Sequence, residues 1–157
     1  MSAIALIACS ASKRETSAPA RELYTGALFR AAVLYAESRH LPWFVLSAKH
    51  WVVRPNQIIY PYDVALGKLR LQPGNERCTE KELAAQWVNH VRRMLMVGDE
   101  PIVRRGDTVV MLAGATYRDA GGLTETLRAC GVEVQIPLEG LAIGQQKSWL
   151  KSATEAA

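Results

Sequence analysis

The sequence predicts one α/β domain, a three-layer α/β/α sandwich around a four-stranded parallel sheet. Four short apolar runs are continuous rather than alternating, which is typical of parallel strands buried on both faces. Segments with a helical spacing of apolar residues separate these runs, and such crossovers between parallel strands are nearly always right-handed. The predicted strands cover residues 3–8, 43–47, 108–113 and 132–138.

Helices are expected between and after these strands. The first has a weak point at Gly26, because glycine costs about 1 kcal/mol in a helix interior. The second begins at Thr79, a plausible N-cap residue with Glu82 three positions on, which is a capping-box pattern. Residues 51–78 carry several prolines and a glycine, so we expect an irregular connection there. The predicted helices cover residues 20–39, 79–96, 119–129 and 144–152.

The 157 residues, 49% of them hydrophobic, suffice for one domain with its own core. We assign residues 1–152 to that domain and residues 153–157 to a frayed C-terminal tail. The net charge of +4 permits a phosphate-bearing partner without requiring one. No apolar stretch approaches the ~20 residues of a membrane span, and the first apolar run lacks the basic flank of a signal peptide. We therefore expect a cytoplasmic protein with no membrane partner.

The three cysteines are far apart and odd in number, which suits reduced thiols in a cytoplasm. Cys9, at a strand end, is interpreted as a small core residue rather than a nucleophile. No Cys/His spacing resembles a zinc site, and no glycine-rich phosphate loop indicates ATP or NAD. We therefore expect neither a metal nor a cofactor, and the pattern favours no particular oligomeric state.

Polar residues follow each predicted strand, and open α/β sheets bind ligands beyond the carboxyl ends of their strands. After the first strand, Ser10, Ser12 and Lys13 offer two hydroxyls and a cation that suit a phosphate or the polar edge of a base. An ordinary strand-to-helix loop is the alternative. Four such clusters at one edge of the sheet predict a single convergent cleft.

The second cluster contains Ser47, Lys49, His50 and Trp51. A lysine beside a histidine can stabilise negative charge on a departing group, and histidine can act as a general acid near neutral pH. A solvent-facing pair is the alternative. Trp51 either joins the core or offers a face on which a base stacks.

A separate candidate lies within the irregular segment, where Asp63 follows Tyr60, Pro61 and Tyr62. A carboxylate flanked by aromatic rings is unusual for mere solvation, and Asp63 is the first candidate for a catalytic carboxylate. Tyr60 and Tyr62 are candidates for stacking on a base. In the alternative interpretation, Asp63 caps a short helix that begins at Val64.

Further candidates follow the third and fourth strands. Gly114, Tyr117 and Arg118 come after the third strand and suit a phosphate. Glu139 ends the fourth strand and either contacts a ribose or base or pairs with a nearby cation. Gln145 opens the last helix, where it either contacts a ligand or lies on the surface.

Together these motifs carry a resemblance that covers nearly the whole chain. They are Cys-Ser-Ala-Ser-Lys at 9–13, Ser-Ala-Lys-His at 47–50, Tyr-Pro-Tyr-Asp at 60–63, Leu-Ala-Gly with Tyr-Arg at 112–118, and Pro-Leu-Glu-Gly-Leu with Ile-Gly-Gln-Gln at 137–146. The combination resembles a small, largely uncharacterised bacterial and phage domain family that is sometimes labelled peroxide-stress-like. Trp51 departs from that pattern, which has a glycine there. The first motif is also similar to a segment of archaeal enzymes that modify deazaguanine in transfer RNA, and the strand layout resembles the uracil-DNA-glycosylase superfamily.

These resemblances and clusters suggest a DNA glycosylase-like enzyme that hydrolyses the N-glycosidic bond of a modified base in DNA or a nucleotide. Asp63 would orient water or stabilise the sugar cation, with Glu139 as its substitute. Lys49 and His50 would stabilise the leaving base or the adjacent phosphate. The alternative is a non-catalytic nucleotide or nucleic-acid binding module in the same cleft, and a third interpretation is a scaffold. A binding module would use a basic face formed by Arg92, Arg93, Arg104 and Arg105.

Overall fold

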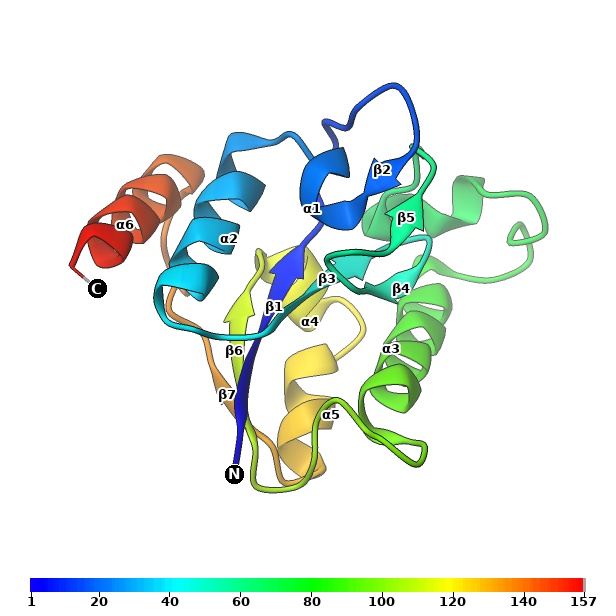
Figure 1. The fold of residues 1–157 in the computed structure, drawn as a ribbon. Coiled ribbons are helices and arrows are strands. Elements are labelled where there is room, and N and C mark those ends of the chain that lie inside the picture. Colours follow the sequence, from blue (N-terminus) through cyan, green and yellow to red (C-terminus); the bar gives the residue numbers. More distant parts are fainter. Residues whose placement is uncertain (157) are drawn as a thin grey trace.

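The computed structural model describes residues 1–156 and has a central five-stranded sheet (Figure 1). Its strand order is β4-β3-β1-β6-β7, and all neighbouring pairs are parallel except β3 with β4. The four predicted strands are therefore neighbours in one sheet, with β1 at the centre. The strands are β1 (Ala3–Ala8), β3 (Trp43–Ser47), β4 (Trp51–Val53), β6 (Thr108–Leu112) and β7 (Glu133–Gln135).

Seven helical segments accompany the sheet among the described residues, and a separate two-stranded pair joins β2 (Ala18–Pro19) to β5 (Ile58–Ile59). No helix in residues 1–156 has the length and apolar character needed to cross a membrane. The helices are α1 (Ala20–Leu23), α2 (Ala27–Ser38), η1 (Leu66–Leu71), α3 (Glu80–Met96), α4 (Ala115–Asp119), α5 (Leu123–Ala129) and α6 (Ile143–Glu155).

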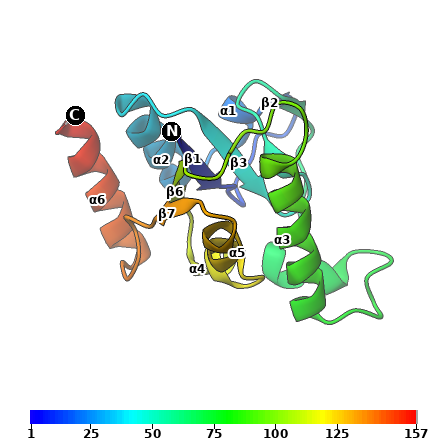
Figure 2. The same cartoon turned by 90° about the horizontal axis from the view of Figure 1, so that it is seen from below.

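The alternating side chains of β1 enter two different hydrophobic clusters. Ile4 and Leu6 pack in one cluster with residues of α3 and α5. Ala5 and Ile7 pack in the other with residues of α2 and α6. Figure 2 shows α2 and α6 on the opposite side of the sheet from α3 and α5. Burial of both faces of the sheet explains why the strands read as continuous apolar runs. Each fully buried leucine-sized side chain contributes about 1.5–3 kcal/mol to the free energy of unfolding.

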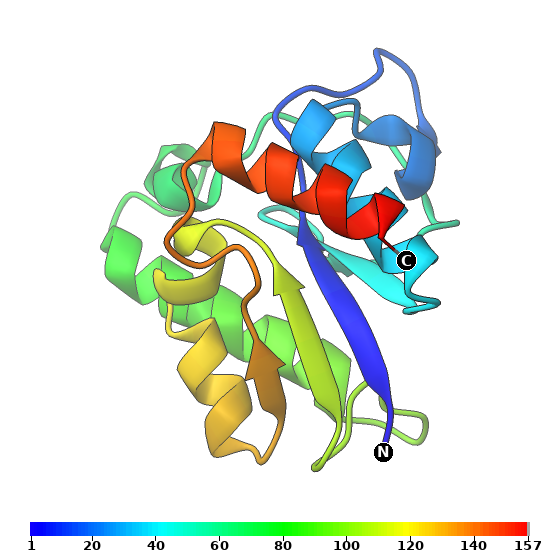
Figure 3. The ribbon, with the colours of Figure 1, turned by 90° about the vertical axis from the view of Figure 1, so that its left-hand side faces the viewer.

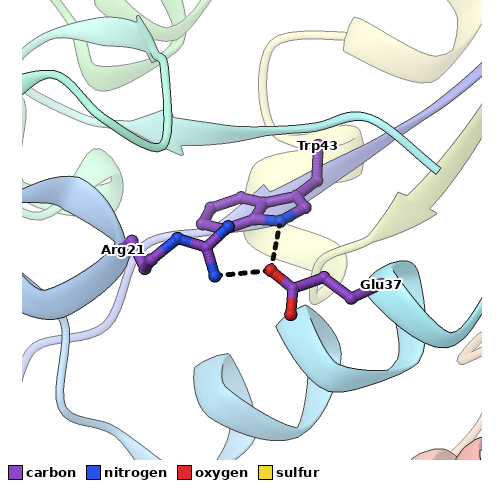
Figure 4. A network of polar contacts seen from close by, with 3 residues as sticks. All are labelled: Arg21, Glu37 and Trp43. Carbon is purple, nitrogen blue, oxygen red and sulfur yellow. Dashed lines mark hydrogen bonds and ion pairs between the residues drawn. The ribbon is translucent and has the colours of Figure 1, made fainter. Parts of the chain in front are cut away.

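A polar network ties α1 and α2 to β3 (Figure 4). The Arg21 guanidinium pairs with the Glu37 carboxylate at 2.5 Å, and the Trp43 indole N–H donates to the same carboxylate oxygen at 3.3 Å. The Arg21 guanidinium also lies 5.3 Å from the centre of the Trp43 ring. The short helix α1 is thereby anchored beside the strand that leads into the second polar cluster.

Several element boundaries differ from the prediction. The helix expected at 20–39 is interrupted by an extended Gly26, whose added Cβ would lie 2.8 Å from the Ser10 Cβ. The helix expected at 119–129 begins only at Leu123, as α5, after a left-handed Gly122 with a φ of 78°, and a separate short helix, α4, ends at Asp119. The segment 51–78, expected to be irregular, contains β4, β5 and η1.

The ends of two further elements also differ from the prediction. The fourth strand spans only Glu133–Gln135. Helix α6 continues to Glu155, so residues 153–155, expected in a frayed tail, are helical, and residue 157 lies outside the described residues. The expected N-cap at Thr79 is confirmed, because its side-chain oxygen accepts the Glu82 backbone N–H at 3.1 Å.

Candidate functional site

Two adjoining cavities flank the loop that follows β1, at the carboxyl ends of β1 and β6. The first has a volume of about 410 Å³ and is called the carboxylate cavity; it is lined by residues 9–11, 13, 63–68, 116 and 117. The second has a volume of about 320 Å³ and is called the helix-end cavity; it is lined by residues 7–12, 26–29, 32, 112–114, 138, 143, 146 and 147. They share Cys9, Ser10 and Ala11, so one loop forms a wall of both.

A hydroxyl network beneath the site centres on Tyr62. Its hydroxyl lies 2.7 Å from the Tyr24 hydroxyl and 2.6 Å from the Ser47 Oγ. Ser47 is fully buried at the end of β3, and its Oγ also accepts the backbone N–H groups of Lys49 and His50 at 3.3 and 3.0 Å. Ser47, expected to contact substrate, therefore holds the turn between β3 and β4 instead. Burial raises the pKa of Tyr24 to about 12 and raises the pKa of Tyr62, so both hydroxyls stay neutral.

Three basic side chains surround the Tyr62 ring. The Lys13 Nζ lies 4.4 Å from the ring centre and the Lys49 Nζ lies 6.0 Å from it, while the His50 ring meets it edge-on at 5.1 Å. Burial lowers the pKa of Lys13, and Cys9 and Asp63 act in the opposite direction. Burial, and then the charge of Lys49, lower the pKa of His50. The Tyr62 ring therefore contacts both the first predicted cluster, through Lys13, and the second, through Lys49 and His50.

Cys9 is more than the core residue expected from the sequence. Its Sγ lies 3.0 Å from the Tyr117 hydroxyl, it is half-buried, and it lines both cavities. The Tyr117 ring meets Trp87 edge-on at 5.7 Å, and burial raises the pKa of Tyr117. The thiol and phenol together place two weakly polar groups in the floor of the carboxylate cavity.

Asp63 lies in the carboxylate cavity together with Lys13, and its side chain is exposed. The alternative interpretation of Asp63 as a helix cap is wrong. The helical segment η1 begins at Leu66, its N-cap is Ala65, and no side chain caps it. The carboxylate is therefore free to face a ligand in this cavity.

The loop after β1 is held by its own hydroxyl. The Ser10 Oγ donates to the Ser12 carbonyl at 2.6 Å and accepts the Gly26 N–H at 3.2 Å, so it shapes the loop where Gly26 approaches closely. Ser12 is exposed and lines the helix-end cavity, as does Gly114 at the end of β6. Lys147 of α6 also lines that cavity and was not among the predicted site residues.

Other expected site residues lie elsewhere. Glu139 is exposed in the turn after β7 and is not among the residues that line either cavity, although its neighbour Leu138 lines the helix-end cavity. The Gln145 side chain accepts the Ala142 backbone N–H at 3.0 Å and so serves the start of α6. Tyr60 is 78% exposed. Trp51 stacks on His90 with ring centres 3.9 Å apart, so one of its faces is already covered.

The backbone at position 51, where the family pattern has a glycine, is left-handed although the residue is Trp51. Its φ is 61°, a left-handed conformation that costs a non-glycine residue on the order of 1 kcal/mol. The stack on His90 and the β4 pairing hold it there. The turn thus keeps the backbone conformation that glycine favours, with a tryptophan in it.

Arg118 is a buried cation without a counter-charge in the described part of the chain. It is 9% exposed, and its Nε has no hydrogen-bond partner among residues 1–156. It belongs to α4, which carries Thr116 and Tyr117 into the carboxylate cavity. Within the same residues, no group of three or more His, Cys, Asp or Glu side chains is placed to hold a metal ion.

The chain belongs to a family of unknown function (DUF6884), whose model matches residues 4–152. This agrees with the expectation of an uncharacterised domain family. A search of curated proteins found no match.

Proposed function

We propose that this member of the family hydrolyses the N-glycosidic bond of a nucleotide, as a DNA glycosylase-like enzyme acting on a modified base. The observation that supports the proposal most directly is the exposed carboxylate of Asp63, which lines one cavity together with Lys13. Water adds to the anomeric carbon of the sugar, the bond to the base nitrogen breaks, and the base leaves with a proton. A carboxylate next to the reacting carbon stabilises the positive charge that the sugar gains in the transition state.

The arrangement of the two cavities supports a nucleotide as the ligand. The carboxylate cavity would take the sugar and base, with Cys9 and Tyr117 along the edge of the base. The helix-end cavity would take the phosphate, because it is lined by the first residues of α2 and α6 and by Lys147. Helix N-termini present free N–H groups and favour anions. In this arrangement the shared loop, with Cys9, would lie between the two parts of one nucleotide.

Charge around the site also supports an anionic ligand. Lys13, Lys49 and His50 surround Tyr62, and Lys13 would stabilise the departing base or the neighbouring phosphate. Arg118 adds a cation that no described residue neutralises. Lys49 and His50 line neither cavity. They would act from the outer rim of the carboxylate cavity.

We infer the reaction class, hydrolysis of an N-glycosidic bond, from the resemblance to the uracil-DNA-glycosylase superfamily. Helices that pack on both faces of the mostly parallel sheet support the three-layer α/β/α arrangement that such a relationship requires. Fold likeness alone carries no function, so the chemistry must be tested at the site.

Base release tests the proposal. The protein is incubated with oligonucleotides and mononucleotides that carry alkylated, deaminated or deaza-modified bases, and free base and alkali-labile abasic sites are measured. Release of a base from any of them, strongly slowed in an Asp63→Asn variant, is the expected result. Tight binding without release from the whole panel would instead indicate a binding module.

A further inference from the structure

A cationic groove runs between α2 and α6 and adjoins the helix-end cavity. Figure 3 shows α6 lying over α2. The groove has a volume of about 620 Å³, and its lining includes Ala31 and Leu34 from α2 and Lys151 from α6. It shares Ala27 and Lys147 with the helix-end cavity, so it continues that cavity along the surface.

The charges along the groove are uneven. Arg30, Lys147 and Lys151 line it against a single carboxylate, Glu155. Among residues 1–156, none of the three cations lies within 4.0 Å of a carboxylate oxygen. Lys147 and Lys151 are four residues apart and therefore lie on one face of α6, about one helical turn from each other. Arg30 comes from the opposite wall, so cations border the groove on both sides.

The groove also contains exposed apolar surface. Leu34 is 59% exposed although it is a large hydrophobic residue, and Ala27 and Ala31 lie on the same face of α2. Proteins that bind single-stranded nucleic acid without sequence preference combine a positively charged groove with side chains, usually aromatic, that contact the bases. This groove supplies the cations, and the exposed Leu34 supplies an apolar contact in place of an aromatic ring. An acidic peptide would use the same cations, but continuity with a cavity suited to phosphate favours a polynucleotide.

We propose that the groove between α2 and α6 binds the single strand that continues from the nucleotide held in the cavities. The inference rests on the proposed function only in placing the reacting nucleotide next to the groove. It narrows the substrate class to a single-stranded polynucleotide, as opposed to a free nucleotide. Arg30, Lys147 and Lys151 contact successive phosphates, and the Leu34 region contacts a sugar or base.

Fluorescence anisotropy with an unmodified, labelled oligothymidylate of about 12 nucleotides tests this binding without any chemistry. The logarithm of affinity falls against the logarithm of salt by about 0.7 per phosphate contacted in a single strand, so three contacts give a slope near −2. Each contact is then worth about fivefold in affinity at 0.1 M salt relative to 1 M. The double variant Arg30→Ala/Lys151→Ala should bind about 25-fold more weakly at 0.1 M, with a slope near −0.7.

The matched control is Lys81→Ala, which removes an exposed cation from α3, the helix that packs in the other hydrophobic cluster. It should leave affinity and slope unchanged, and circular dichroism confirms that every variant is folded. Unchanged oligonucleotide binding in the double variant would overturn the inference. Equal competition by polyglutamate would also overturn it, because the groove would then accept an acidic polypeptide.

The two proposals fail separately. Loss of oligothymidylate binding in the double variant supports the groove even if no substrate ever releases a base. Base release from an oligonucleotide at saturating enzyme, unchanged in rate in the double variant, supports the chemistry independently of the groove.

Discussion

Replacement of Arg118 by methionine should make the protein more stable. Arg118 as a whole residue is 9% exposed, and its Nε has no partner among residues 1–156. A buried donor without a partner costs about 1–3 kcal/mol. Methionine keeps an unbranched apolar chain in the same space and removes that penalty.

The expected gain is therefore about 1–3 kcal/mol of unfolding free energy. In a domain of this size, 1 kcal/mol corresponds to about 2–4 °C in melting temperature. Arg118→Met should then melt about 2–12 °C above the wild type. A residue that reduces stability in this way is expected where function needs its charge.

Thermal and urea unfolding of both proteins measure the effect. Arg128→Met is the matched control, because the Arg128 guanidinium donates to the Val134 carbonyl at 3.0 Å. That variant should lose about 1 kcal/mol. With inorganic pyrophosphate added, the wild type should gain stability and Arg118→Met should gain less. An Arg118→Met protein that melts below the wild type would refute the reasoning, because the guanidinium would then have stabilising contacts.

Three further predictions concern the residues around the site. Tyr62→Phe leaves two hydroxyl partners at 2.7 and 2.6 Å without their bond and should cost about 1–3 kcal/mol in urea unfolding, whereas Tyr60→Phe, at a 78% exposed position, should change stability by less than about 0.5 kcal/mol. Gly26→Ala should displace the Ser10 loop and cost about 1–3 kcal/mol, because the new Cβ would lie 2.8 Å from the Ser10 Cβ. His50 has a lowered pKa, so the unfolded state binds more protons as pH falls below about 6.5, and stability decreases there; His50→Asn should reduce the difference in unfolding free energy between pH 7 and pH 5.

Each of these has a clear opposite result. Equal stability of the two tyrosine variants would mean that the hydroxyl network contributes nothing. Wild-type stability of Gly26→Ala would mean that the loop has room to move. An unchanged pH dependence in His50→Asn would assign the acid sensitivity to other groups.

The parallel strands could be predicted because continuous apolar runs arise wherever both faces of a strand are buried. The edge strand β4 could not, because Trp51–Val53 is short and follows a tight turn that Ser47 holds through tertiary hydrogen bonds. The break of the first helix depends on the close approach of Gly26 to Ser10, residues far apart in sequence. The secondary-structure propensities of neighbouring residues carry no information on contacts between residues far apart in the sequence.

The candidate site was predictable in part. Ser12, Lys13 and Asp63 line the cavities, as their positions after strands or in the long loop suggested. Glu139 does not, because β7 ends early and a turn carries this residue to the surface. Lys147 lines the helix-end cavity only because α6 packs on α2. The spacing of residues within α6 does not reveal that packing.

The central claim is that the Asp63 carboxylate stabilises a sugar cation in the transition state. With a base-releasing oligonucleotide in hand, the most direct test is the single-turnover rate of Asp63→Asn, measured at saturating enzyme with affinity measured separately. Asparagine keeps the shape and removes the charge, so the rate should fall by about 10²–10³ while affinity stays within about twofold. Asp99→Asn, an exposed carboxylate beyond α3, serves as the control and should keep the full rate. An Asp63→Asn variant that releases base at the wild-type rate would contradict the claim.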